Sequence, residues 1–152
     1  MRTLANILWH IPFLGFLNAL ASFLLGTFFV FTVIGIPIGL GLIQYSRFLL
    51  TPFTGSLIDK RDLGTKQNRL WLVYGRIIQI IYLPIGILLA IATLFQIALL
   101  FFTIIGIPLA IILAKSLGTY FNPVNKIYVP QIVATEAARR KGEYDIDRYF
   151  NK

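Results

Sequence analysis

The amino-acid sequence predicts an all-α integral membrane protein with four transmembrane helices, arranged as two helical hairpins that repeat one another. Three observations lead to this fold class. Two long stretches, residues 3–46 and 77–114, contain no Lys, Arg, Asp or Glu, although 13% of the 152 residues are charged. Hydrophobic residues make up 57% of the chain. A short motif with glycine and proline occurs once in each stretch. The charged residues therefore belong to water-facing segments that flank the membrane helices.

The length of each uncharged stretch indicates two membrane crossings. About 20 residues of α-helix span the roughly 30 Å hydrocarbon core of a bilayer. The first stretch corresponds to about 66 Å of helix and the second to about 57 Å, so each is too long for one crossing and too short for three. We therefore expect a first repeat at residues 1–50 and a second repeat at residues 76–124, each with two helices joined by a short turn.

The basic residues indicate which segments face the cytoplasm. With two crossings in each repeat, the N-terminus, a linker at residues 51–75 and a C-terminal tail at residues 125–152 all lie on one side. All 14 Lys and Arg residues then share that side, in agreement with the positive-inside rule. We expect both termini in the cytoplasm. Because this rule accounts for the net charge of +8 and no RNA- or DNA-binding motif accompanies it, we expect no nucleic acid as a partner.

The two uncharged stretches resemble each other, which indicates an internal duplication. The heptapeptide F-T-V-I-G-I-P at residues 31–37 reappears as F-T-I-I-G-I-P at residues 102–108. Repeats of this kind are typical of many membrane proteins. Because each copy holds an even number of crossings, we expect the two copies to run in the same direction through the membrane, related by an axis near the membrane normal.

Each Gly-Ile-Pro motif is expected to interrupt its helix. Proline lacks a backbone N–H and clashes with the carbonyl one turn back, and a carbonyl freed in a membrane needs a partner such as a threonine hydroxyl. Two interpretations are open: a paired break that lines a polar path, or a kink that only lets short helices pack. The candidate pore or helix-break residues are Thr32, Gly35, Pro37, Thr103, Gly106 and Pro108.

Small residues follow each break at a spacing that lets two helices approach closely. Gly35 and Gly39 are separated by three residues, and Gly106 and Ala110 repeat this spacing. Such small residues favour close helix packing in membranes. The contact lies either within one chain or between two copies.

The tail contains a predicted short cytoplasmic helix that starts after Pro130 and ends near Gly142. Glu136 and Arg140 stand one turn apart on it, which modestly supports a helix. A basic cluster on this helix is a candidate site for anionic lipid headgroups; the alternative is an ordinary solvated helix. The cluster consists of Arg139, Arg140 and Lys141.

We expect no enzymatic activity, no cofactor and no metal site. The chain has no Cys and a single His, and the uncharged stretches lack the acids that catalysis or metal binding would use. A proton- or sodium-coupled pump is not expected either, because coupling relies on ionisable groups at membrane depth. Only neutral polar side chains remain there: Asn6, Asn18, Ser22, Thr27, Thr32 and Gln44 in the first stretch, and Gln79, Thr93, Gln96 and Thr103 in the second.

Several features together resemble the YccF family of small bacterial inner-membrane proteins. They are the N-terminal M-R-T-L-A-N-I-L-W, the doubled I-G-I-P with Gly39 after the first copy, and A-T-E-A-A-R-R in the tail. The resemblance extends over essentially the whole chain. It implies a multi-pass protein of the bacterial inner membrane and supports the duplication. The family has no established activity, so the resemblance implies no catalytic or binding residues.

Two functions agree with these observations. The first is a homo-oligomeric passive ion channel or permeation pathway, shaped by the two Gly-Ile-Pro breaks and lined by neutral polar groups. Four helices enclose little space, so such a pathway needs several copies around an axis. The second is a non-conducting membrane scaffold or accessory subunit whose basic cytoplasmic face binds lipids or a protein partner.

Overall fold

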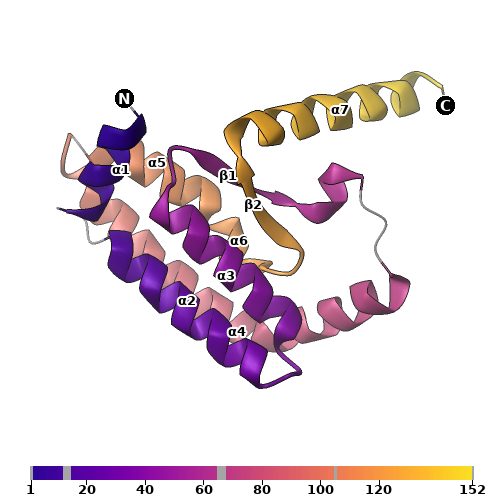
Figure 1. The fold of residues 1–152 in the computed structure, drawn as a ribbon, viewed down its shortest axis with the longest axis horizontal. Coiled ribbons are helices and arrows are strands. Elements are labelled where there is room, and N and C mark those ends of the chain that lie inside the picture. The colour runs from indigo at the N-terminus through magenta and orange to yellow at the C-terminus, as the bar shows by residue number, and fades with distance from the viewer. Residues whose placement is uncertain (1, 12–14, 65–67, 105, 152) are drawn as a thin grey trace.

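The computed structural model describes residues 2–11, 15–64, 68–104 and 106–151 (Figure 1). Most of these residues are helical, and one small antiparallel sheet joins two segments that are far apart in the sequence. The mostly helical class is as predicted. The sheet was not predicted.

The first repeat forms three helices: α1 (Arg2–His10), α2 (Gly15–Phe31) and α3 (Ile36–Leu50). The predicted break at the first Gly-Ile-Pro motif is confirmed, because α2 ends before the motif and α3 begins inside it. Pro37 lies in the first turn of α3, where a helix has no intrahelical use for the N–H that proline lacks. The break is therefore a full turn between two helices and not a kink within one.

Close contact between α2 and α3 depends on two glycines. A Cβ atom on Gly39 would meet the backbone carbonyl of Gly26, and a Cβ atom on Gly26 would meet that of Gly39. Small residues allow this approach of two backbones. Of the two locations left open by the sequence, the structure therefore uses Gly39 for packing within one chain.

The second repeat contains α4 (Arg69–Phe101), α5 (Gly106–Ser116) and the short α6 (Gly118–Phe121), and α4 begins within the segment predicted as linker, residues 51–75. With 33 residues, α4 is about 50 Å long. Among the described residues it is the one helix that is long and apolar enough to cross a membrane, whereas α2, α3 and residues 106–121 form shorter apolar helices. Four membrane crossings therefore stay a prediction.

The two hairpins run in opposite directions, so the predicted parallel arrangement is wrong for this fold. The hydroxyl of Tyr74, near the start of α4, donates a hydrogen bond of 2.6 Å to the carbonyl of Ile34 in the first turn. The second turn follows Phe101 at the other end of α4, about 40 Å away along the helix. Near that end, the side chain of Asn18 at the start of α2 donates to Gln96 (2.9 Å). Thus α2 and α4 are antiparallel.

The physical reason is the path of the linker, which runs back along α3 before α4 begins. Strand β1 (Gly55–Asp59) pairs antiparallel with β2 (Lys126–Pro130), with Gly55 opposite Pro130 and Asp59 opposite Lys126. A 3₁₀ helix, η1 (Lys60–Leu63), follows β1. This pairing brings the linker and the tail together on one side of the helices.

The tail helix α7 (Gln131–Phe150) is longer than predicted, because it continues past Gly142. Ala134 and Ala137 in its first half are buried against the rest of the fold, whereas from Ala138 onward its residues are exposed, although Lys141 still pairs with Asp62 of η1. In Figure 1 the second half of α7 projects away from the body. We call β1, η1, β2 and α7 together the polar module.

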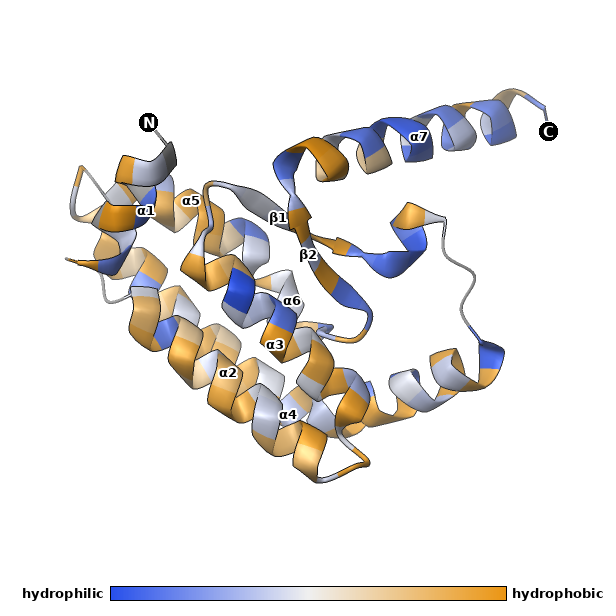
Figure 2. Cartoon of the chain, viewed as in Figure 1, coloured by the Kyte–Doolittle hydropathy of each residue, from blue (hydrophilic) through white to orange (hydrophobic). Residues whose placement is uncertain are grey.

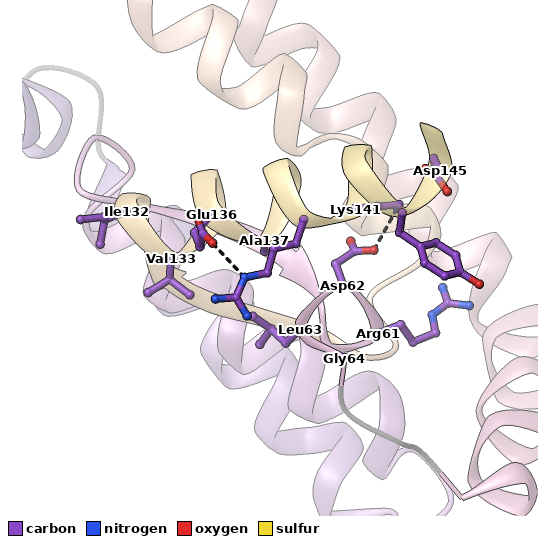
Figure 3. A pocket seen from close by; sticks show the side chains of 12 residues that line it. Arg61, Asp62, Leu63, Gly64, Ile132, Val133, Glu136, Ala137, Lys141 and Asp145 are labelled. Carbon is purple, nitrogen blue, oxygen red and sulfur yellow. Dashed lines mark hydrogen bonds and ion pairs between the residues drawn. The ribbon is translucent and has the colours of Figure 1, made fainter. Parts of the chain in front are cut away.

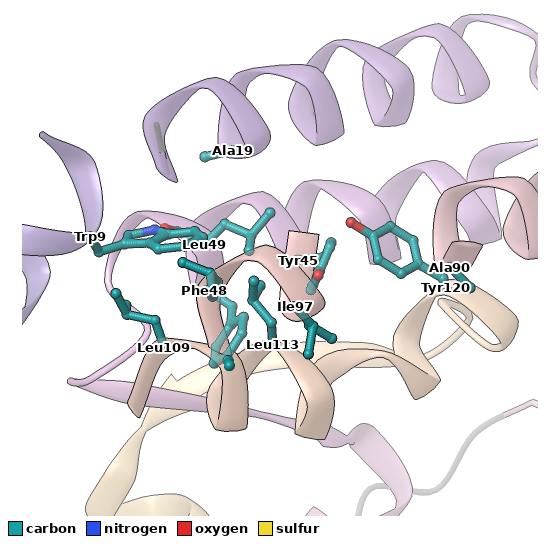
Figure 4. Packing of buried hydrophobic residues seen from close by; sticks show 12 residues of the cluster. Trp9, Ala19, Tyr45, Phe48, Leu49, Ala90, Ile97, Leu109, Leu113 and Tyr120 are labelled. Atoms are coloured by element: carbon teal, nitrogen blue, oxygen red, sulfur yellow. The ribbon is translucent and has the colours of Figure 1, made fainter. Parts of the chain in front are cut away.

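Buried aromatic and aliphatic side chains connect the two repeats (Figure 4). The indole N–H of Trp9 donates 2.6 Å to the carbonyl of Leu49. Tyr45 meets Tyr120 edge to face, with ring centroids 4.9 Å apart. The buried members of this cluster are Trp9, Ala19, Tyr45, Phe48, Leu49, Ala90, Ile97, Leu100, Leu109, Ala110, Leu113 and Tyr120.

Polarity is divided across the molecule. In Figure 2 the apolar colours fill α2 and α4 along one side, whereas α7 and η1 on the opposite side are mostly hydrophilic. Large apolar side chains of α2 and α4 are exposed over the length of both helices, for example Phe16, Phe28, Ile81 and Phe95. Such a large exposed apolar surface is typical of a membrane-contacting face.

Candidate functional site

The two predicted helix breaks share one pair of threonine hydrogen bonds. In the first, the hydroxyl of Thr32 donates to the carbonyl of Phe29 (2.7 Å) and accepts the N–H of Gly35 (3.2 Å). In the second, the hydroxyl of Thr103 donates to Leu100 (3.0 Å) and accepts the N–H of Gly106 (3.1 Å). Each threonine hydroxyl thus accepts a backbone N–H in the turn before the next helix, and the Gly106 N–H also donates to the backbone carbonyl of Thr103 (3.0 Å).

The structure does not bring the two breaks together. Thr32, Gly35 and Pro37 lie at the end of the molecule where α4 starts, and Thr103, Gly106 and Pro108 lie where α4 ends. The six candidate residues therefore do not form one constriction within a single chain. Their observed contacts are those of helix termini.

Neutral polar side chains from both repeats do meet, between α2 and α4. Asn18, Ser22, Thr93 and Gln96 line a cavity of about 380 Å³ together with leucines and Tyr120. Asn18 donates to Gln96 (2.9 Å), and the hydroxyl of Thr93 donates to the carbonyl of Leu89 in its own helix (2.9 Å). Sequence reasoning noted these side chains one by one but missed their grouping, which depends on the antiparallel placement of α2 and α4.

A groove of about 740 Å³ lies between η1 and α7 (Figure 3). Its apolar lining comes from Leu63 of η1 and from Ile132, Val133 and Ala137 of α7. Polar side chains border it, and Figure 3 shows Lys141 reaching Asp62 across the groove; their ion pair measures 2.8 Å. This ion pair ties α7 to η1.

The predicted basic cluster is already paired with carboxylates. Arg139 pairs with Glu136 (2.9 Å) and with Glu143, and Arg140 pairs with Glu136 (2.8 Å). Hydrogen bonds from Arg139 and then Arg140 lower the pKa of Glu136 to about 2. The predicted pairing of Glu136 with Arg140 is present, and the three basic residues Arg139, Arg140 and Lys141 do not form a patch of uncompensated charge.

Asp59 fixes the corner between β1 and η1. Its carboxylate accepts the backbone N–H of Arg61 (3.0 Å) and forms an ion pair with the guanidinium of the same residue (2.8 Å). Partial burial alone would raise the pKa of Asp59, but the hydrogen bonds and charge of Arg61, with a smaller effect from Lys126, hold it below its ordinary value. The side chain therefore stays ionised and caps η1.

Groups that bind metal ions are not assembled in the described part of the chain. No three His, Asp or Glu side chains gather there in a way that could hold a metal. The single histidine, His10, contacts the carbonyl of Leu50 at 2.8 Å through Nε2. This contact joins α1 to the end of α3.

Comparison with known proteins finds a family match for the first repeat. Residues 4–55 match the family model of the YccF inner membrane component domain. The resemblance inferred from the sequence is confirmed over this segment, which contains α2 and α3 in full and most of α1. No curated protein and no solved structure matches the chain.

Proposed function

We propose that this membrane protein, which carries a YccF inner membrane component domain in its first repeat, is a non-conducting scaffold of the bacterial inner membrane. In this proposal the apolar helices hold the protein in the membrane, and the polar module presents α7 and the groove beside η1 to the cytoplasm. No catalytic step, cofactor or metal is involved.

The observation that carries the proposal is the separation of the two helix breaks. A pathway shaped by both breaks of one chain would need them side by side, whereas they lie at opposite ends of α4, about 40 Å apart along the helix. Hydroxyl groups within the apolar helices are also used locally, since Thr27 donates to the carbonyl of Phe23 (2.8 Å) as Thr93 does to Leu89. Polar groups with internal partners support packing and not conduction.

A second copy of the chain is the partner that best fits α7. The basic turn 139–141 is followed directly by an acidic turn at 143–147. In an antiparallel pair of α7 helices centred on Gly142, the basic turn of each copy lies beside the acidic turn of the other. No atom lies within 4 Å of a Cβ atom built on Gly142, so this position is open to a second helix. Because carboxylates already compensate the cluster, we favour this homo-oligomer over anionic lipid headgroups as its partner.

Ion flux in liposomes tests the scaffold. Purified protein is reconstituted, and flux is followed at both signs of voltage and over a range of pH. We expect no flux above that of empty liposomes, and an ionophore added at the end shows that the vesicles held their gradient. A flux that increases with the amount of protein would contradict the proposal.

Passive conduction is the second candidate function, because one observation favours it. The cavity beside Asn18, Ser22, Thr93 and Gln96 gathers neutral polar groups inside the apolar part of the fold, and such groups line many passive pathways. If flux is found, replacing Asn18 and Gln96 together by Leu should change its rate or selectivity. Flux that is indifferent to this double substitution would exclude the cavity as the path.

Cysteine cross-linking tests the homo-oligomer, since the chain has no native Cys. The variant Gly142→Cys should form a disulfide-linked dimer in oxidised membranes. The matched control is Thr135→Cys, which is also exposed on α7 but lies about 21 Å from its counterpart in the proposed pair. Equal cross-linking of both variants, or of neither, would count against an antiparallel pair centred on Gly142.

A further inference from the structure

The polar module lies alongside α3 for much of the length of that helix. A Cβ atom on Gly41 would overlap the backbone carbonyl of Pro123, just before β2. One turn later Gln44 accepts the backbone N–H of Tyr128 (3.2 Å), and Thr51 contacts the Tyr128 hydroxyl (2.6 Å). Residues 41–51 cover about 15 Å along the helix axis. The segment with β2 therefore lies alongside α3 and contacts more than one end of it.

The helix α7 forms a further layer on the same side. Its start is held at the end of α3, where the N–H of Gln131 donates to the carbonyl of Thr54 (3.2 Å). Farther along, Lys141 is held over η1 by Asp62 (2.8 Å). Figure 2 shows the result: hydropathy changes across the layers, from α2 and the apolar part of α4 through α3 to the module, while the first turns of α4 are polar.

An upright orientation of these helices conflicts with this layering. If α3 stood along the membrane normal, the two-stranded ribbon beside it would lie at hydrocarbon depth. Open sheet edges in contact with lipid do not occur there, because their backbone groups find neither water nor a partner strand. At one end of the ribbon the charged residues Asp59 and Lys126 are opposite each other. In an upright protein these charges would lie near the hydrocarbon, which is energetically costly.

The two hairpin turns point to the same conclusion. Ile34 in the first turn is 64% exposed, and Ile104 in the second is 89% exposed. In an upright protein these two turns, at opposite ends of α4, would meet the headgroups or water on opposite faces of the membrane. Exposed isoleucines at both ends are instead expected if both ends are surrounded by acyl chains.

We infer that α2, α3 and α4 lie along the plane of the membrane, with α2 and the uncharged part of α4 after Arg76 embedded in the acyl chains of one leaflet and the polar module in water. One leaflet offers about 15 Å of hydrocarbon, and packed helices lie about 8–10 Å apart, so a layer of α2 and α4 beneath α3 fits this depth. Arg47, one turn beyond Gln44 on the module side of α3, then reaches the headgroups. The inference rests on the membrane location of the proposed scaffold and adds how the membrane is bound.

Single cysteines in the full chain test the orientation. Ile34→Cys and Ile104→Cys place a thiol in each turn, and Asp145→Cys places one in the polar module. A membrane-impermeant maleimide is applied to intact spheroplasts and to inverted inner-membrane vesicles. We expect Asp145→Cys to react in inverted vesicles only, and both turn variants to react in neither preparation. All three should react after solubilisation in detergent.

Labelling of a turn from the side opposite Asp145→Cys would overturn the inference. That result would leave the scaffold intact, whereas ion flux would contradict the scaffold whatever the labelling shows. A second measurement guards against a thiol that is merely unreactive. With a fluorophore attached to each turn cysteine, nitroxides on the acyl chains of the lipid should quench both to a similar extent. Quenching of the two turns at clearly different depths would also overturn the inference.

Discussion

At the scale of single residues, one threonine performs the same task in each helix break. The hydroxyls of Thr32 and Thr103 accept the N–H groups of Gly35 and Gly106 in the turn before the next helix, and the Gly106 N–H also donates to the backbone carbonyl of Thr103. The sequence Thr-x-x-Gly-Ile-Pro therefore forms a turn in which the threonine hydroxyl, and not a water molecule, accepts the glycine N–H. This accounts for its recurrence in two uncharged stretches better than a role in a shared pathway does.

Removing either hydroxyl should lower stability without creating or abolishing flux. We expect Thr32→Val to cost about 1 kcal/mol of unfolding free energy, the typical value of a lost hydrogen bond, and Thr103→Val to cost less, because the Gly106 N–H keeps the Thr103 carbonyl as a partner. Thermal unfolding in detergent measures the loss. The control is Thr27→Val, because the Thr27 hydroxyl only donates to a carbonyl within α2 and its removal leaves no N–H unpaired. If Thr27→Val loses as much unfolding free energy as Thr32→Val, the role of the Thr32 hydroxyl as an N–H acceptor is contradicted.

Asp59 should contribute to stability through the corner between β1 and η1. Asp59→Ala removes the acceptor for the Arg61 N–H and the ion pair with its guanidinium, so we expect a loss of about 1 kcal/mol or somewhat more. The shift in unfolding temperature measures it. Asn151→Ala, which changes an exposed residue after the end of α7, should leave that temperature nearly unchanged.

The ion pairs of Glu136 should respond to acid in a defined window. Because its pKa is lowered from 4.5 to about 2, the folded protein keeps Glu136 ionised where an unfolded chain would already protonate it. The contribution of these pairs is therefore complete above about pH 4.5 and is lost as the pH falls toward 2. Carboxyl NMR of the protein in detergent should show this titration, and Glu136→Gln should remove it. A midpoint near 4.5 would contradict the pairing.

At the scale of elements, two glycines with different surroundings should respond in opposite ways to the same substitution. Gly41→Ala forces a methyl group into the backbone of Pro123, so we expect a loss of about 1–3 kcal/mol from overpacking. Gly142→Ala meets nothing within 4 Å in the middle of α7 and should stabilise the helix by about 1 kcal/mol. Unfolding temperatures of the two variants provide the comparison. Similar effects of both substitutions would show that α3 does not pack tightly on β2.

Local chemistry explains which elements could be predicted. Proline and glycine act within one turn of helix, so the breaks before Pro37 and Pro108 were readable from the sequence, as was the start of α7 after Pro130. The end of α7 was not, because Gly142 costs only about 1 kcal/mol in a helix. The ion pairs of Arg139 with Glu136 and Glu143 span the turn around it and offset part of this cost.

At the scale of the whole molecule, the ribbon between linker and tail decides the arrangement of the repeats. Its partners lie far apart in the chain, and each strand is only five residues long. Strands this short carry little periodicity for sequence reasoning to detect. A sequence pattern that does not reveal the ribbon does not reveal that the linker returns along α3. An even number of crossings in each repeat then predicts parallel repeats. The cavity beside Asn18 and Gln96 was missed for the same reason, since it exists only when α2 and α4 are antiparallel.

The ribbon itself can be tested in native membranes. Ile58 and Ile127 are directly opposite each other in the sheet, where Cβ atoms lie about 5 Å apart. A short thiol cross-linker should therefore join the double variant Ile58→Cys and Ile127→Cys within one chain. Each single variant provides a control, because it can be linked only to another molecule. Absence of the intramolecular product, with both thiols reactive, would exclude the pairing of linker and tail.

The position of β2 near the end of the chain has a consequence for biogenesis. While the ribosome is still making the second repeat, α3 has already formed but Gly41 and Gln44 have no partner, because Pro123 and Tyr128 have not yet been synthesised. One side of α3 therefore stays uncovered in the membrane until the tail has been synthesised. A chain that stops before Pro123 lacks both partners and leaves that side of α3 uncovered.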